Sequence, residues 1–227
     1  DGRGAGGHRR AREQGAEAIA VTRQVNLPGA ARPPQHQNPN IDDARRLVFV
    51  HNPKAAGTSF RAWLGLEGAI QHGFPTLNVP APLWQAYTVV VVVRDPVERA
   101  LSSYRFHTHE SYEGGYLKKY PDLHSWDLAK YLDVMIGQEL FVLAPQYRYC
   151  EHLLSTKRPD FLLRFENLDP TPLADRLGIT DPFPFHNRNQ NPKSADLDER
   201  TYGRLVQHFR MDYAAFGYRP KPFELIR

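Results

Sequence analysis

A short segment at residues 54–59 carries the residue types that bind an anion. It reads Lys-Ala-Ala-Gly-Thr-Ser, so one full positive charge and two hydroxyl groups lie close together, separated by small side chains. Small side chains leave backbone N–H groups open to a ligand, and a helix predicted to begin near Thr58 would add free donors and a partial positive charge. The residues expected to bind this anion are Lys54, Ala55, Ala56, Gly57, Thr58 and Ser59.

A second anion site is predicted further along the chain, around Arg94. Arg94 ends an apolar run, and Ser102 follows two helical turns into the next segment, where it can face the same side. A guanidinium group binds a phosphate through several N–H donors, and a serine hydroxyl can fix its position. An ion pair between Arg94 and Glu98, four residues later, is the competing interpretation.

Three apolar runs predict the strands that position these residues, at 47–50, 87–93 and 161–165. The second run is rich in valine, which is typical of a strand buried on both faces of a parallel sheet. Because a predicted helix follows each run, both anion-binding segments should lie at the carboxyl ends of neighbouring strands. We therefore predict a single P-loop-like α/β domain, with a central parallel β-sheet flanked by helices.

Capping signals mark where the predicted helices begin. The sequence Asp-Pro-Val-Glu at 95–98 has an N-cap acid, a proline at the first helical position and a glutamate at the third. It predicts a helix that runs to about residue 107. Ser125 is expected to cap a further helix over 126–135.

The order Pro-Lys-x-x-Gly-Thr-Ser at 53–59 differs from the P-loop of nucleotide triphosphatases, in which the lysine follows the last glycine. It resembles the 5′-phosphosulfate loop of sulfotransferases that use 3′-phosphoadenosine 5′-phosphosulfate (PAPS). The stretch 93–104, Val-Arg-Asp-Pro-Val-Glu-Arg-Ala-Leu-Ser-Ser-Tyr, is similar to the 3′-phosphate motif of the same family. The resemblance covers about residues 46–218, and the chain is similar to the carbohydrate-type group that includes heparan and chondroitin sulfotransferases.

The resemblance implies transfer of a sulfuryl group from PAPS to an acceptor hydroxyl, with a carbohydrate as the expected acceptor, by in-line displacement. In this family Lys54 would meet the charge that develops on the leaving phosphate, while Arg94 and Ser102 would hold the 3′-phosphate. No metal is expected, because the sequence has no acidic or histidine cluster with metal-ligand spacing.

The base that accepts the acceptor's proton is expected in the loop between the two motifs. His72 lies there and resembles a His-Gly element of uronyl-type members, and histidine is the side chain most often used as a base at neutral pH. Glu67 is the alternative, since other members use a glutamate in this region. His51 is expected to be fixed at the base of the anion loop, and His107 to lie away from the sulfuryl end.

Composition narrows the class of partner. The net charge is +4, but residues 1–46 hold eight arginines and five acidic residues, so the rest of the chain is nearly neutral. A nearly neutral domain with a few focused cations suits a small phosphorylated ligand better than nucleic acid. Residues 1–43 are rich in Gly, Arg, Gln and Pro and are predicted to be a disordered low-complexity tail, with the sulfotransferase-like domain over 44–227.

The chain has no apolar run near the roughly 20 residues that a membrane-spanning helix needs. Its single cysteine, Cys150, agrees with a reducing compartment. A cytoplasmic location is therefore expected if the chain is complete. A membrane-anchored or luminal form is the alternative, because the sequence begins at Asp1 instead of Met.

Two rival functions fit part of the pattern. A nucleotide or small-molecule kinase would use the same anion loop for ATP, but it would need an acidic Mg²⁺ ligand after a strand. A non-catalytic module for anionic polymers would need a basic face spread over the surface. The sequence carries neither signal clearly.

Overall fold

The computed structural model of the protein describes residues 38–184 and 195–225. The chain divides into two compact units, and every described residue belongs to the unit Pro34–Arg227. Residues 1–37, which form most of the predicted tail, lie outside the described residues.

A four-stranded sheet forms the centre of the domain. Its strands are β1 (Ile41–Asp42), β2 (Leu47–Val50), β3 (Thr88–Val93) and β4 (Phe161–Arg164), adjacent in that order. β2, β3 and β4 run parallel, which confirms the predicted parallel arrangement. β1 pairs antiparallel with β2 and lies inside the segment predicted as tail, so the folded domain begins before residue 44.

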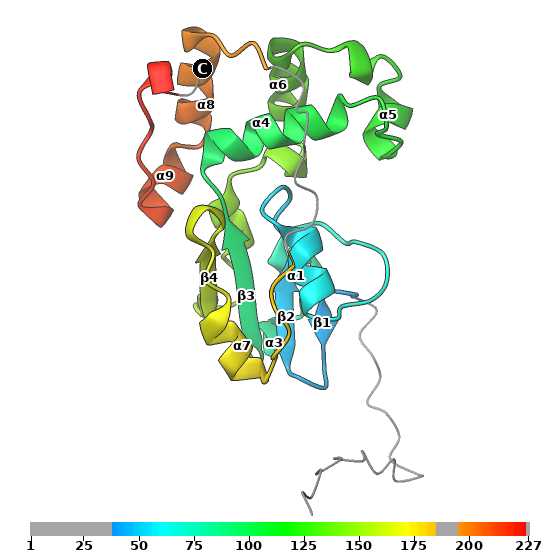
Figure 1. Cartoon of the computed structure of the whole chain (residues 1–227), viewed down its shortest axis with the longest axis vertical. Coiled ribbons are helices and arrows are strands. Elements are labelled where there is room, and N and C mark those ends of the chain that lie inside the picture. The colour runs from blue at the N-terminus through cyan, green and yellow to red at the C-terminus, as the bar shows by residue number, and fades with distance from the viewer. Residues whose placement is uncertain (1–37, 185–194, 226–227) are drawn as a thin grey trace, which may run out of the picture. The chain divides into compact units, whose positions relative to one another are not determined.

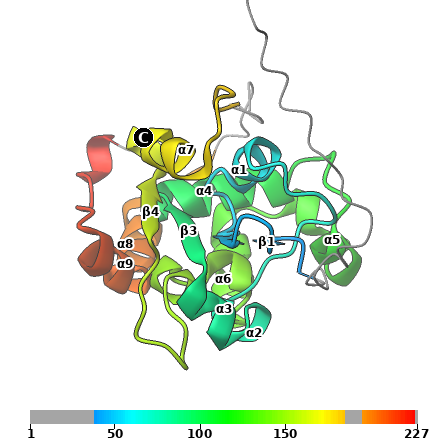
Figure 2. The ribbon, with the colours of Figure 1, turned by 90° about the horizontal axis from the view of Figure 1, so that it is seen from below.

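Helices cover both faces of the sheet, so successive side chains of the strands enter two different cores (Figure 2). One face meets α1 (Gly57–Trp63) and α7 (Thr171–Leu177). The other face meets the short helices α2 (Pro75–Asn78) and α3 (Ala81–Ala86), where Trp84 is completely buried. Burial on both faces explains why the valines of β3 need no alternation with polar residues.

Helix α4 (Pro96–His107) follows β3 and crosses above its carboxyl end (Figure 1). It begins as predicted, because the Asp95 carboxylate accepts a hydrogen bond from the Glu98 N–H at 3.0 Å. A cap of this kind stabilises a helix by about 1 kcal/mol. The cap fixes where α4 leaves the strand and therefore where the residues on its faces lie relative to the sheet.

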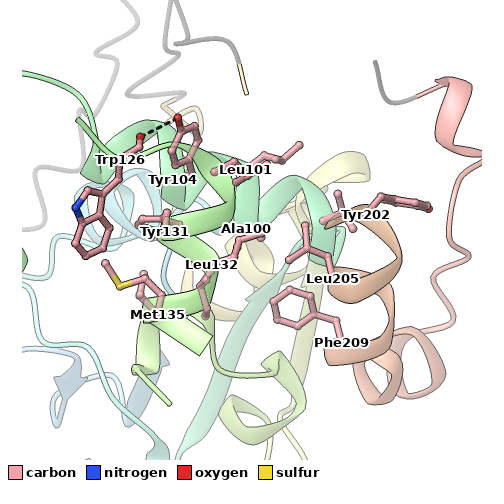
Figure 3. Close-up of a cluster of buried hydrophobic side chains, with 14 of the residues drawn as sticks. Ala100, Leu101, Tyr104, Trp126, Tyr131, Leu132, Met135, Tyr202, Leu205 and Phe209 are labelled. Carbon is pink, nitrogen blue, oxygen red and sulfur yellow. Dashed lines mark hydrogen bonds between the residues drawn. The ribbon is translucent and has the colours of Figure 1, made fainter. Parts of the chain in front are cut away.

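On the side away from the sheet, α4 packs against α6 (Leu128–Gly137) and α8 (Glu199–His208). Figure 3 shows the apolar side chains of this core between the three helices. α6 starts later than predicted, and Asp127, not Ser125, is its cap, since the Asp127 carboxylate accepts from the Lys130 N–H at 2.8 Å.

Shorter elements complete the domain: α5 (Gly115–Lys119), α9 (Arg210–Phe216), and the 3₁₀ turns η1 (Leu123–Ser125), η2 (Phe141–Leu143), η3 (Gln146–Tyr149), η4 (Phe165–Asn167) and η5 (Phe223–Leu225). Arg99 of α4 is fully buried and donates to the carbonyl oxygens of Val142 at 3.0 Å and Ala144 at 2.6 Å. These bonds fix η2 and the start of η3 against α4. No helix of the described residues is long and apolar enough to cross a membrane.

Candidate active site

The anion loop connects β2 to α1 and is tightly bent. Lys54 and Ala56 both have positive φ angles, 64° and 59°, which non-glycine residues seldom adopt. Strain of this kind costs on the order of 1 kcal/mol or more per residue, and it gathers at sites that bind ligands. Ala56 is the N-cap of α1, so the N–H groups of Gly57 and Thr58 have no acceptor within the helix.

Gly57 is required by its contact with His51. A Cβ atom built on Gly57 would lie 1.9 Å from His51 Nε2. The space beside this glycine is therefore filled by an imidazole ring. His51 is buried, and desolvation followed by the charge of the neighbouring His72 lowers its pKa to about 3. As predicted, His51 is fixed at the base of the loop.

Lys54 lies next to Arg94, so the structure brings the two predicted motifs together. Arg94 Nη1 donates to the Lys54 carbonyl oxygen at 3.4 Å. Burial, with a further contribution from Arg94, lowers the pKa of Lys54 to about 8. The Lys54 ammonium group lies 3.8 Å from the centre of the Phe106 ring, at the end of α4. This contact partly replaces the water that a buried ammonium group loses.

Gln146 of η3 holds the chain at the end of β3 where Arg94 lies. Its side chain accepts from the Arg94 N–H at 3.0 Å and donates to the Arg94 carbonyl at 2.7 Å. Asn52 donates to the same Gln146 oxygen at 2.9 Å, which ties the anion loop to the strand end. The Asp212 carboxylate accepts from the Gln146 N–H at 2.8 Å, which holds Gln146 in place between Arg94 and Asn52.

The Arg94 side chain rests on an aromatic ring and is only weakly paired. Its guanidinium carbon lies 4.4 Å from the centre of the Phe165 ring. The nearest Glu98 oxygen is 3.9 Å from Nη2, at the limit of an ion pair. The ion pair predicted between Arg94 and Glu98 is therefore present. It leaves Arg94 Nε buried without a partner among the described residues, so Arg94 can still bind an anion.

Ser102 lies on α4, partly buried, on the helical face that also carries Glu98 and Arg105. Among the described residues no contact joins Ser102 to Arg94. Burial lowers the pKa of Arg94, and the charge of Arg105 makes a smaller contribution in the same direction. Arg105 is thus near enough to Arg94 for the two charges to interact, which the sequence motifs did not indicate.

His72 and Glu67, the two candidates for the base, occupy different surroundings. The His72 ring lies 4.4 Å from the His51 ring and 5.7 Å from the Phe141 ring, measured between centres. Although His72 reaches solvent, desolvation and the charge of Lys54 lower its pKa to about 4. The Glu67 side chain is exposed, and no contact joins it to the anion loop among the described residues.

Arg61 of α1 shapes the loop that carries both candidates. It is buried, and its Nη2 donates to the carbonyl oxygens of Glu67 at 2.9 Å and Gly68 at 3.0 Å. Its Nη1 donates to the Pro39 carbonyl at 2.9 Å. Its Nη1 also donates to Asn40 Oδ1, while its other partners are backbone oxygens, so a local sequence pattern gives no sign of this role.

His107 lies nearer to Lys54 than its position at the end of a helix predicts. His107 ends α4 next to Phe106, the residue whose ring contacts Lys54. Burial and then the charge of Lys54 lower the pKa of His107 to about 3, and His72 adds a smaller contribution. The end of α4 contacts the anion loop through Phe106, which the helix length alone could not reveal.

Several buried polar atoms around this loop have no hydrogen-bond partner among the described residues. They include His51 Nδ1, Asn52 Oδ1, Arg94 Nε and Tyr116 Oη. An unpaired buried polar atom costs about 1–3 kcal/mol, so a cluster of them is expected where a ligand supplies the missing partners. Arg94 Nε and the Tyr116 hydroxyl can donate to an anion, as can Lys54, whereas Asn52 Oδ1 can only accept from a donor group of the ligand.

Comparison with known families gives one result. A family model described as "Sulfotransferase family" matches residues 71–219, which include His72, Arg94 and Ser102 but not the anion loop. Comparisons with curated proteins and with solved structures gave no match. Because the matched segment spans well over half of the chain and contains the β3–α4 motif, the chain belongs to the sulfotransferase family.

Proposed function

We propose that this protein transfers a sulfuryl group from PAPS to an acceptor hydroxyl, with a carbohydrate as the acceptor. The main support for this proposal is that the anion loop contacts the β3–α4 motif, because Arg94 Nη1 donates to the Lys54 carbonyl oxygen. In a chain of the sulfotransferase family, two adjacent anion-binding segments at parallel strand ends suit a donor with a phosphosulfate and a separate phosphate.

Lys54 is the residue proposed to stabilise the leaving group. When bound, PAPS supplies an activated sulfuryl group and departs as adenosine 3′,5′-bisphosphate. Lys54 would donate to the phosphate oxygen that gains charge, and the N–H groups at the start of α1 would hold neighbouring oxygens. Burial lowers the pKa of Lys54 to about 8, and an anion beside the ammonium group favours its charged form, so binding should raise this pKa.

Arg94, Ser102 and Arg105 are proposed to hold the 3′-phosphate. Arg94 is fixed at its backbone by Gln146, and its side chain is held against Phe165. A side chain held in this way loses little freedom when a phosphate binds. The same phosphate would also replace the weak contact at 3.9 Å that Arg94 makes with Glu98.

His72 is proposed to accept the acceptor's proton. With a pKa near 4 it is neutral at physiological pH, so its lone pair is available. Phe106 and Phe141 are partly exposed next to this region, with 48% and 36% of their surfaces accessible. Flat apolar surfaces of this kind suit the C–H face of a sugar ring, which supports a carbohydrate acceptor.

Titration calorimetry with adenosine 3′,5′-bisphosphate, AMP, ATP with Mg²⁺ and heparin tests this proposal against its rivals. We expect the bisphosphate to bind most tightly. Arg94→Ala should weaken that binding, whereas Arg158→Ala, which removes an exposed arginine ahead of β4, should not. Tighter binding of ATP would favour a kinase, and tight binding of heparin alone would favour a polymer-binding module.

A further inference from the structure

His107 has no role in the proposed function, although it lies near Lys54 and is surrounded by aromatic rings. Its ring packs edge-on against Tyr112 and Tyr116, with centres 4.9 Å and 5.1 Å away. Tyr116 in turn lies 6.2 Å from Phe141, whose other neighbour is His72. The rings of Tyr116 and Phe141 therefore lie between the two histidines. Both histidines are near enough to Lys54 for its charge to contribute to the lowering of their pKa values, which is mainly due to burial.

One nitrogen of His107 is fixed by a buried hydrogen bond. Nδ1 lies 2.7 Å from the Tyr131 hydroxyl and 3.4 Å from Ser103 Oγ, and the two hydroxyl groups are 2.9 Å apart. Tyr131 belongs to the core between α4 and α6, where Figure 3 shows it beside Tyr104 and Trp126. Because Tyr131 is held by this packing, its hydroxyl sets the orientation of the imidazole ring.

The bond between Tyr131 and His107 favours one neutral form of the imidazole. Burial raises the pKa of Tyr131, so its hydroxyl keeps its proton, and burial lowers the pKa of His107, so the ring is neutral. A phenol is a better donor than acceptor, and an unprotonated imidazole nitrogen is a good acceptor. When Tyr131 donates to Nδ1, the single proton of the ring must be on Nε2.

We propose that His107 is a hydrogen-bond donor of the transfer site, with its Nε2–H directed at an oxygen of the sulfuryl group in transit. This inference rests on the proposed function and adds a residue to it. The acceptor oxygen forms a bond to sulfur, and the bond from sulfur to the bridging phosphate oxygen breaks. That oxygen keeps the electron pair beside Lys54, the acceptor's proton passes to His72, and His107 transfers no proton. A neutral, preset donor stabilises the charge of the transition state without reorganisation.

The first test needs no turnover. Long-range ¹H–¹⁵N NMR of the ligand-free protein labelled at histidine reports which nitrogen of each ring carries the proton, with His107→Gln used for assignment. We expect the Nε2–H form for His107, and a mixture of the two neutral forms in Tyr131→Phe. A proton found on Nδ1 of His107 in the unaltered protein overturns the proposal.

The second test measures kcat and bisphosphate affinity in four variants. Removing one such donor lowers kcat by about 10²–10³-fold in other enzymes, so His107→Ala should show a loss of this order with bisphosphate affinity unchanged. His107→Gln, which keeps an N–H near the position of Nε2, should recover most of the loss. Tyr131→Phe should lose activity several-fold, and His109→Ala is the control, because this histidine lies just beyond α4 and pairs with Ser111.

Each result has a definite meaning. If His107→Ala keeps kcat within twofold, His107 is only a core residue and the proposal fails while the proposed function stands. If His107→Gln is as inactive as His107→Ala although both bind the bisphosphate normally, a donor role is wrong. If the unaltered protein transfers no sulfuryl group, the proposed function fails and this inference fails with it.

Discussion

Gly57→Ala should destabilise the protein because His51 occupies the space that the new methyl group would need. The added Cβ would lie 1.9 Å from Nε2 and 2.2 Å from Cδ2 of the His51 ring. That ring cannot move freely, since it is buried with Phe49 at 5.9 Å and His72 at 4.4 Å between ring centres. Overpacking of this kind costs about 1–3 kcal/mol.

Urea denaturation measures this cost, and a matched glycine provides the control. Gly203 lies inside α8, and a Cβ there would meet no atom within 4 Å. Gly203→Ala should therefore stabilise the protein by about 0.5–1 kcal/mol, through the higher helix propensity of alanine. A Gly57→Ala variant that is as stable as Gly203→Ala would refute the reasoning.

The clash itself can be isolated with a double-mutant cycle. If His51 is the obstacle, Gly57→Ala should cost much less in a His51→Ala background, and the coupling energy should be about 1–3 kcal/mol. For a domain of this size, each kcal/mol shifts Tm by about 2–4 °C, which thermal unfolding resolves easily. Additive effects of the two changes would show that the ring and the glycine do not compete for space.

Three further predictions concern the site residues and pH. Arg94→Ala and Ser102→Ala should weaken binding of adenosine 3′,5′-bisphosphate more than binding of AMP in calorimetry, and equal losses for both ligands would indicate a purely structural role. His72→Ala should lower kcat by about a hundredfold with little change in nucleotide affinity, whereas an active His72→Ala and an inactive Glu67→Gln would give the base to the carboxylate. His51 and His107 have folded pKa values near 3, below the unfolded value near 6.5. The unfolded chain therefore binds more protons, so the free energy of unfolding should fall as pH drops from about 6.5 toward 3. Urea titrations at pH 7 and pH 5 should show this fall, and equal stability at both would contradict it.

The local features of the fold could be predicted from sequence because nearby residues determine them. The valines of β3 and the Asp95 cap of α4 are signals of this kind, and both appear as expected. β1 was missed, since a two-residue strand is defined by its pairing with β2 and not by any apolar run. The start of α6 was misplaced because Ser125 and Asp127 are both good caps, and only tertiary packing chooses between them.

The candidate site was only partly predictable, because some of its residues are brought together by contacts between segments distant in the chain. Lys54 and Arg94 could be found because each follows a strand, and parallel strands bring such residues to one edge of the sheet. Gln146 and Phe106 could not, because they reach the site through contacts made by segments distant in the chain. The closeness of His107 to Lys54 could not be predicted either, because nothing in the sequence around it shows that the end of α4 contacts the anion loop.

The central claim, sulfuryl transfer from PAPS that depends on Lys54, is tested most directly by following radiolabelled sulfate from PAPS to a panel of carbohydrate acceptors. We expect acceptor-dependent transfer by the unaltered protein. Losing one donor to the leaving group costs about 2–4 kcal/mol of barrier stabilisation, so Lys54→Ala should be slower by roughly 30- to 1000-fold. Lys130→Ala, which removes an exposed lysine paired with Asp122, should retain full activity. Absence of transfer by the unaltered protein, or transfer by Lys54→Ala at the unaltered rate, would contradict the claim.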